Sequence, residues 1–389
     1  MHPDFRHSKP TAVPGNPGLT AEASSIMSDR PLSQIDPNFE GTPLGEEVPA
    51  FHPIPSGPME LGGFAWYGSE GAFCRLPRNA LERMNEGVRT LAWHTSGGRV
   101  RFRTDSPLIA LSAELDSAAD MSHMPRTGSG GFDLFFGTGA DMRFVKGVRH
   151  EAGSRIVEGV FVSNLPRRMR DCTIYFPLYR GVTSARLGLT ADSEIQAPRP
   201  CGTKAPLVFY GSSITQGGCA SRPGNAYTAL VARRLDADFI NLGFSGSARG
   251  EPAMAEVIAS MTMSAFIMDY DCNAPDPEHL RRTHQPFFQV IRDAQPRLPV
   301  VMVSRPDYHH DVHDERHAGD KARLDIIRAT CRAAVDAGDR HVRFVDGSRL
   351  FGDDNRDACT VDGCHPNDLG FYRMARGIAP AVREALRTP

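Results

Sequence analysis

The sequence lacks the features that typify membrane proteins, secreted proteins and nucleic-acid binders. Nowhere in its 389 residues do about 18 apolar residues run together, so we expect no membrane span and no membrane partner. Lysine and arginine number 44 against 46 acidic residues, without a basic stripe, which excludes the electrostatic footprint of a nucleic-acid binder. The first residues lack the apolar segment of a secretory signal, so we expect a cytoplasmic location.

Metal-binding patterns are also missing. The eight cysteines form no Cys-x-x-Cys pair and no zinc-like spacing, so we expect reduced, mostly buried thiols and neither a metal nor a cofactor. Apolar residues make up 40% of the chain, which is ordinary for a globular protein that folds without disulfide bonds or structural metal ions.

The chain divides into a tail and two predicted domains. Residues 1–55 are dense in proline, glycine, serine and charge, and indicate a tail or arm. Residues 56–197 contain short strand-like segments between turn residues, which predict a β-sandwich or jelly roll; the segments are RVRFRT, LIALSAEL, GFDLFFG, RIVEGVFV, CTIYFPLY and SARLGLT. The proline-rich stretch APRPCGTKAP then indicates a linker.

Residues 205–389 show a different pattern. Five apolar runs, each followed by a longer helical segment, predict parallel strands joined by helices, and hence a three-layer α/β/α domain of flavodoxin-like type; the runs are LVFYG, FINLG, AFIMDY, PVVMVS and VRFVDG. Ligands of such open sheets bind outside the carboxyl ends of the strands, so the residues that follow each strand are the candidates for function.

Three of these residues have the chemistry of a serine nucleophile and its base. Ser213 follows the first strand in Gly211-Ser212-Ser213, where glycine permits a tight turn. The last strand leads to a loop with Asp362 and His365, whose spacing lets the carboxylate reach Nδ1 of the imidazole while Nε2 points elsewhere. An ordinary turn serine, and a histidine that caps the following helix, are the alternatives.

A serine nucleophile also needs hydrogen-bond donors for the developing oxyanion. The loop after the second strand, 241–247, has glycines that can expose a backbone N–H. The loop after the third strand ends in Asn273, whose side-chain amide can donate. Glycine and asparagine favour turns in any case, so each loop alone is weak support.

Taken together, these blocks resemble the SGNH (GDSL-like) hydrolase superfamily, whose Ser, Gly, Asn and His occur in this chain order. The resemblance assigns Ser213, Gly246, Asn273 and His365 to the four blocks, with Asp362 as the triad acid and Ser213, Gly246 and Asn273 as the oxyanion hole. The first block is Gly-Ser-Ser where Gly-Asp-Ser is common. The third block and the segment 131–135, Gly-Phe-Asp-Leu-Phe, are similar to a bacterial subfamily with an N-terminal Gly-x-Asp-Leu-Tyr domain.

The resemblance implies an esterase that acts on a small acyl ester, with acetylated carbohydrate as the favoured substrate by analogy of architecture. Acyl transfer with the same residues and non-catalytic carbohydrate binding are the alternatives. The oligomeric state, including a homo-oligomer, stays open.

Other residues invite weaker hypotheses. Arg222 and Arg305 follow strands and could hold a polar or anionic substrate, or could form structural ion pairs. The histidine-rich segment 309–317 could contact substrate, act as a lid or bind a metal, or be an exposed loop. Trp66 and Trp93 could stack on sugar rings or pack in the core.

Overall fold

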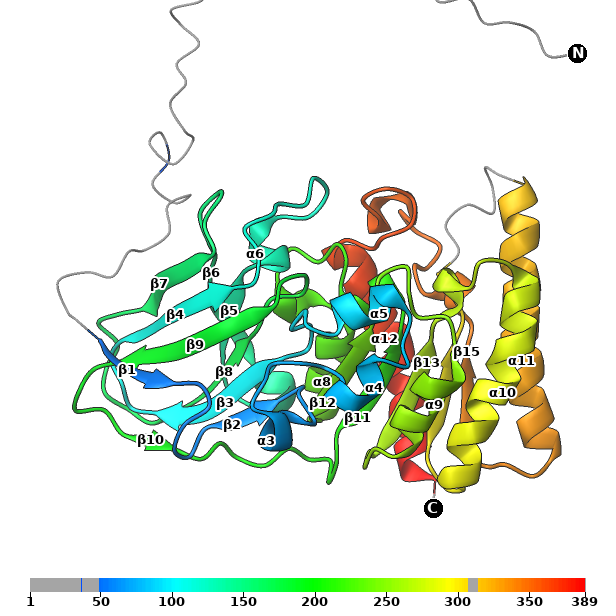
Figure 1. The fold of residues 1–389 in the computed structure, drawn as a ribbon, viewed down its shortest axis with the longest axis horizontal. Coiled ribbons are helices and arrows are strands. Elements are labelled where there is room, and N and C mark those ends of the chain that lie inside the picture. The colour runs from blue at the N-terminus through cyan, green and yellow to red at the C-terminus, as the bar shows by residue number, and fades with distance from the viewer. Residues whose placement is uncertain (1–35, 37–48, 307–313, 389) are drawn as a thin grey trace, which may run out of the picture. The chain divides into compact units, whose positions relative to one another are not determined.

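The computed structural model describes residue 36 and residues 49–306 and 314–388 (Figure 1). The chain from Thr42 onward forms one compact unit. Within it we distinguish a β-rich half, residues 49–197, from an α/β half, residues 205–388.

The β-rich half consists of two antiparallel sheets. One has the strand order β1-β9-β4-β7, and the other has the order β10-β3-β8-β5-β6, with β2 also paired to β3. The strands are β1 Ala50–Pro53, β2 Glu60–Gly62, β3 Arg99–Thr104, β4 Ile109–Leu115, β5 Phe132–Phe136, β6 Arg143–Val148, β7 Ile156–Val162, β8 Arg170–Tyr175, β9 Val182–Leu189 and β10 Ile195–Gln196. All six segments predicted as strands contain strands.

A single core fills the space between the two sheets. Val100 and Phe102 of β3 and Ile174 of β8 contact the same apolar cluster as Leu111 of β4 and Leu187 of β9, and all are buried. Because alternate residues of a strand point to one face, this cluster explains the apolar and polar alternation of the sequence.

Strand β1 lies within the segment that the sequence assigns to the tail. Its residues pair with β9 from Ala50 opposite Leu189 to Pro53 opposite Arg186, and the Arg186 guanidinium lies 5.0 Å from the ring centre of Phe51. The β-rich half therefore begins before residue 56. The sequence gives no clear signal of this, because β1 is a short edge strand without alternation.

The α/β half has a five-stranded sheet in which every pairing is parallel, in the order β12-β11-β13-β14-β15. Its strands are β11 Leu207–Gly211, β12 Phe239–Gly243, β13 Ala265–Asp269, β14 Val300–Val303 and β15 Val342–Val345. Its helices are α7 Ser213–Gln216, α8 Tyr227–Leu235, α9 Pro252–Ala259, α10 Pro277–Ala294, α11 Asp314–Asp336 and α12 Asp368–Arg387. The strand and helix alternation predicted from the sequence is confirmed.

Helices cover both faces of this sheet. Buried residues of α9, α10 and α11 share one core cluster with alternate strand residues such as Tyr210 and Met268. Residues of α8 and α12 share a second cluster with Phe209 and Ile267. The half is therefore a three-layer α/β/α arrangement, as its sequence predicts.

The segment between β2 and β3 was not predicted to pack on the parallel sheet. It contains α3 Tyr67–Glu70, α4 Arg78–Leu81 and α5 Glu86–Leu91, and a further short helix, α6 Arg126–Ser129, follows β4. Leu76, Met84 and Val88 of this segment are buried in the same cluster as α9 and α10. The β-rich half thus contributes to the core of the α/β half.

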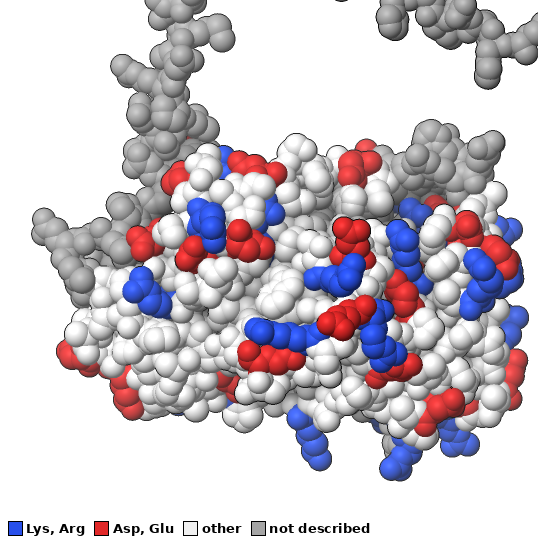
Figure 2. Space-filling model, viewed as in Figure 1, with Lys and Arg blue, Asp and Glu red and all other residues white. Residues whose placement is uncertain are grey.

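The charges on one face, the described helices and the cysteines bear on the expectations drawn from the sequence. On the face shown in Figure 2, acidic and basic side chains of the described residues are interspersed, without a broad area of one sign. None of the helices in the described ranges has the length and apolarity that crossing a membrane requires. Five of the eight cysteines are buried and all are free thiols, which fits the sequence prediction.

Candidate active site

The strand order creates a site at one edge of the parallel sheet. β11 lies between β12 and β13, so the chain leaves β11 toward one side of the sheet and later strands are added on the other. Such a switch point opens a crevice at the carboxyl ends of the strands. Ser213 follows β11 and Asn273 follows β13, so the topology brings two of the predicted residues to this crevice.

A tight strand-to-helix turn presents Ser213. Ser212 caps α7, its hydroxyl accepting a hydrogen bond from the Ile214 backbone N–H at 3.2 Å, and Ser213 is the first residue of the helix. A Cβ atom at Gly211 would lie 2.2 Å from the Asp269 carbonyl oxygen and 2.1 Å from Oγ1 of Thr215. Glycine is therefore required here for β13 and α7 to approach so closely.

The structure brings Ser213, His365 and Asp362 together. The Ser213 hydroxyl Oγ lies 2.9 Å from Nε2 of His365, and Nδ1 of the same ring lies 2.7 Å from Oδ2 of Asp362. Such a chain can move a proton from the hydroxyl to the imidazole while the carboxylate fixes the tautomer.

Two backbone groups hold the Asp362 carboxylate. Its Oδ1 accepts hydrogen bonds from the N–H of Cys364 at 3.0 Å and of His365 at 2.7 Å, which leaves Oδ2 for the imidazole. Partial burial raises the pKa of Asp362, but the hydrogen bonds from the backbone and ring of His365 outweigh it and lower the pKa below its usual range. The carboxylate therefore stays charged in mild acid.

The three predicted oxyanion donors are Ser213 itself and one residue from each of the segments that follow β12 and β13, Gly246 and Asn273. The Asn273 amide donates one hydrogen to the Phe244 carbonyl at 2.8 Å, which ties its side chain to the loop after β12. That loop contains Gly246 with φ of +67°, a left-handed conformation that favours glycine. The Ser213 N–H belongs to the first turn of α7, where backbone N–H groups have no partner within the helix.

The β-rich half braces the turn that carries Ser213. The Tyr179 hydroxyl donates to the Ser213 carbonyl at 3.3 Å, and the Ser96 hydroxyl donates to the Gln216 carbonyl at 2.6 Å. Both ends of α7 are thus held by residues from the other half of the chain.

A buried arginine and an asparagine brace the end of β12 and the loop after it in the same way. The Arg75 guanidinium, fully buried, donates to the carbonyls of Asn241 at 2.9 Å and Gly243 at 2.7 Å. The Asn85 amide donates to the Ser247 carbonyl at 2.9 Å. The backbone that carries Gly246 is therefore fixed on both sides by the β-rich half.

The sequence analysis did not identify His123, which the structure places beside His365. The two ring centres are 6.1 Å apart, with the planes inclined at 49°. His123 lies between β4 and α6 in the β-rich half, where nothing in the local pattern distinguishes it. Only the packing of one half on the other brings it to the site.

Arg222 and Arg305 both form ion pairs. The Arg222 guanidinium lies 3.5 Å from the Asp133 carboxylate and 3.8 Å from the Phe144 ring centre, so it faces the β-rich half. The Arg305 guanidinium lies 3.0 Å from the Asp320 carboxylate. These contacts are the structural alternative raised from the sequence, and a substrate contact for either arginine stays a prediction.

The two tryptophans and the histidine-rich segment, the remaining candidates from the sequence, have different outcomes. Trp66 is partly buried against the core of the α/β half, whereas Trp93 is 38% exposed with the Arg78 guanidinium 5.8 Å from its ring centre. Residues 307–313 and the side chains of 314–317 lie outside the described residues, so the histidine-rich segment stays a prediction. Among the residues that the structure describes, no three potential metal ligands cluster.

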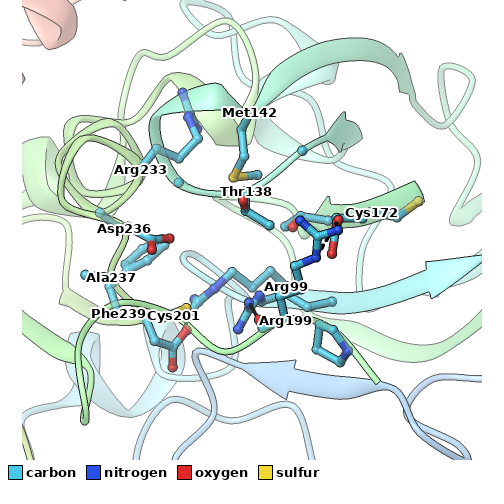
Figure 3. A pocket seen from close by; sticks show the side chains of 18 of the residues that line it. Arg99, Thr138, Met142, Cys172, Arg199, Cys201, Arg233, Asp236, Ala237 and Phe239 are labelled. Atoms are coloured by element: carbon cyan, nitrogen blue, oxygen red, sulfur yellow. Dashed lines mark hydrogen bonds and ion pairs between the residues drawn. The ribbon is translucent and has the colours of Figure 1, made fainter. Parts of the chain in front are cut away.

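A separate cavity lies at the amino ends of the parallel strands, next to Phe239, the first residue of β12 (Figure 3). The carboxyl ends are about 16 Å away, the length of a five-residue strand. Two ion pairs lie in its wall, since Arg99 pairs with Asp238 and Arg199 lies 3.5 Å from Asp171. The cavity is therefore distinct from the site around Ser213.

Comparisons with known proteins agree with this division. Residues 204–383 match the model of the GDSL-like lipase/acylhydrolase family, and residues 51–195 match the model described as the N-terminus of SGNH hydro-type esterases. No curated protein matches the sequence.

Three solved structures share the fold over 87% of this chain and 98% of their own. A protein from Bacteroides ovatus ATCC 8483, described as a GDSL-like lipase, is 28% identical with a TM-score of 0.79. The salicylyl-acyltransferase SsfX3 from a tetracycline biosynthetic pathway is 19% identical with a TM-score of 0.71. The acetyl xylan esterase Est2A from the rumen bacterium Butyrivibrio proteoclasticus is 13% identical with a TM-score of 0.54.

Proposed function

Because the chain belongs to the SGNH (GDSL-like) hydrolase family, in the group with an N-terminal GxDLY domain, we propose that it is a serine esterase for short-chain acyl esters, foremost acetyl esters of carbohydrates. The single observation that carries the proposal is the hydrogen-bonded chain from the Ser213 hydroxyl through His365 to Asp362.

Ser213 attacks the ester carbonyl in the first step. As its oxygen forms a bond to the carbonyl carbon, its proton passes to Nε2 of His365, which lies 2.9 Å away. Asp362 stabilises the imidazolium that forms, through the 2.7 Å hydrogen bond to Nδ1. When the tetrahedral intermediate collapses, the imidazolium gives its proton to the leaving alcohol, and an acyl group stays on Ser213.

The negative charge on the carbonyl oxygen is stabilised by the backbone N–H groups of Ser213 and Gly246 and by the Asn273 side chain. An amide has two hydrogens, and one of those of Asn273 already donates to Phe244. That bond orients the second hydrogen, so the donor needs little reorganisation in the transition state.

Water then attacks the acyl-enzyme with His365 as the base. The side chain of His365 is 25% exposed and that of Asp362 is 39% exposed, so water has access to the base. This exposure favours hydrolysis over acyl transfer to another acceptor, which uses the same residues. Retention of the complete Ser, His and Asp arrangement argues against a protein that only binds carbohydrate.

The carbohydrate part of the proposal rests on analogy. Acetyl xylan esterase activity belongs to a solved structure that shares the fold at 13% identity, which shows a similar fold alone. A panel of acetylated sugars and p-nitrophenyl esters of increasing chain length tests both the acyl and the alcohol preference.

A fluorophosphonate probe tests the nucleophile directly. We expect it to modify Ser213 in the wild-type protein, with the modified peptide identified by mass spectrometry, and to leave Ser213→Ala unlabelled. Ser212→Ala is the matched control and should stay labelled, because the Ser212 hydroxyl caps α7 at Ile214. Labelling of another residue, or of none, would exclude Ser213 as the nucleophile.

A further inference from the structure

We propose that His123, from the β-rich half, binds a free hydroxyl group of the alcohol moiety next to the ester and thereby selects esters of polyhydroxylated alcohols. The inference rests on the proposed function, because it assigns the alcohol side of the same site. It goes further in naming the residue that recognises that side and the chemical group it recognises.

The position of His123 follows from the proton transfer to the leaving group. His365 must come within about 2.6–3.2 Å of the alcohol oxygen in order to protonate it. The carbon atoms that follow this oxygen must therefore lie beside the His365 ring. The His123 ring centre is 6.1 Å from that of His365, so a hydroxyl on the next carbon is within reach of one hydrogen bond.

The loop that carries His123 is anchored on both sides of it. Met124 is buried in the core cluster of the α/β half, and Met121 packs against the same cluster. Farther along, the Thr127 hydroxyl donates to the Ser221 carbonyl at 2.6 Å. The Asp120 carboxylate accepts from Nε of Arg126 at 2.9 Å, which closes the loop on itself.

This anchoring holds the loop of His123 against the polypeptide segment that follows Ser213 and α7. A Cβ atom at Gly128 would lie 2.2 Å from the Ala220 carbonyl oxygen, so α6 rests directly on the segment that follows α7. The loop is thereby held at a fixed distance from the nucleophile. Because the backbone of the loop is already fixed, only the side chain of His123 has to be ordered when a substrate binds.

The His123 ring itself has unused hydrogen-bonding capacity. His123 is exposed, and within the described ranges its imidazole contacts the His365 ring without a hydrogen bond to any side chain or backbone group. A neutral imidazole has one donor and one acceptor nitrogen, and a hydroxyl likewise donates and accepts. The two groups are therefore complementary, and a purely apolar alcohol moiety would not use them.

A pair of small esters of nearly equal shape tests the inference. 2-Hydroxyethyl acetate and propyl acetate differ in a hydroxyl against a methyl group, and hydrolysis of each is followed by acetate release. We expect the wild-type protein to prefer the hydroxyl ester in kcat/KM. In His123→Ala this preference should fall by roughly three- to tenfold, the contribution of one neutral hydrogen bond.

Two further variants separate recognition from structure. His123→Gln keeps a donor and an acceptor and should restore part of the preference, whereas Ser122→Ala, at the exposed neighbouring position, should leave it unchanged. Thermal unfolding should differ little among the three variants, because the exposed ring has no hydrogen bond to lose.

The possible results distinguish failure of this inference from failure of the proposed function. The inference is overturned if wild-type protein shows no preference between the two esters. It is also overturned if His123→Ala loses activity equally on both, or keeps the wild-type ratio of the two kcat/KM values. None of these results contradicts the proposed esterase function. If wild-type protein hydrolyses neither ester nor p-nitrophenyl acetate and Ser213 is not labelled, the proposed function fails and the inference with it.

Discussion

Asp362 shows how single residues prepare the site before any substrate binds. Its Oδ1 is occupied by two backbone N–H groups and its Oδ2 by the imidazole, so both oxygens have fixed partners. The carboxylate therefore cannot turn away from His365, and its lowered pKa keeps it charged. In the proposed mechanism, orientation of the ring and stabilisation of the imidazolium both depend on this one side chain.

Asp362→Asn should lower kcat by about 100-fold to 10,000-fold, because an amide facing Nδ1 favours the wrong tautomer of His365. Turnover of p-nitrophenyl acetate measures the loss. Asp357→Asn, at an exposed position in the same part of the chain, is the control and should stay active. An Asp362→Asn enzyme with normal kcat would remove Asp362 from the mechanism.

Asn273→Ala should lower kcat by roughly 100-fold or more and change KM little, because the amide binds the oxyanion only in the transition state. Steady-state kinetics on p-nitrophenyl acetate distinguishes the two parameters. The variant also loses the 2.8 Å hydrogen bond to Phe244, so thermal unfolding is measured alongside. A large loss of stability with unchanged kcat would make Asn273 a structural residue.

At the scale of elements, β5 of the β-rich half connects to the segment before α8. Asp133, the aspartate of the Gly-Phe-Asp-Leu-Phe motif, is fully buried and accepts a hydrogen bond from the Gly224 N–H at 2.9 Å. Burial raises the pKa of Asp133 to about 6, against the opposing effects of Gly224, Arg222 and Arg233. The motif thus joins the two halves through a carboxyl group that titrates in mild acid.

This titration predicts a pH-dependent stability. The pKa of Asp133 rises on folding from 3.8 to about 6, so the folded state binds the proton more tightly than the unfolded state. The carboxyl group therefore contributes most to the stability of the folded protein below the unfolded pKa. That contribution, about 3 kcal/mol, is lost as the pH rises from about 4 through 6.

Asp133→Asn lacks the titrating group and keeps an acceptor for Gly224. The free energy of unfolding of wild-type protein minus that of the variant should therefore fall by about 2.4 kcal/mol between pH 4 and pH 7. Denaturant unfolding at several pH values measures both. A difference that is constant with pH would contradict the titration of Asp133.

At the scale of the whole molecule, the site depends on both halves of the chain. Tyr179 and Ser96 hold the turn at Ser213, and Arg75 and Asn85 hold the loop that carries Gly246. All four belong to the β-rich half, and the residues they hold belong to the α/β half. The two halves therefore build the candidate site together.

Residues 205–389 expressed alone should lose most of their activity or become insoluble. Removal of the β-rich half exposes apolar residues of the core cluster that packs against Leu76, Met84 and Val88, and it releases the loops next to Ser213. Expression yield, solubility and p-nitrophenyl acetate turnover test this. An isolated α/β half with full activity would show that the β-rich half is dispensable for catalysis.

The sequence alone determined the residues of the site that follow strands. Ser213, Asn273 and His365 could be identified because parallel strands place their carboxyl ends at one edge, so residues far apart in the chain meet there. Short strand-like segments between turn residues likewise predicted six strands in the first half. Two of them, RVRFRT and LIALSAEL, alternate with the period of two that a sheet packed on one face requires.

Tertiary structure decided everything that depends on how the two halves pack. His123 and Arg75 lie in segments without periodic or motif signals, and their roles arise from contacts with residues more than a hundred positions away, such as the Arg75 bond to Asn241. Arg222 could be placed near the site from the sequence, but only packing shows its ion pair with Asp133. The period of the apolar residues indicates which face of a helix or strand is buried. It does not indicate which other element covers that face, because this depends on the tertiary fold.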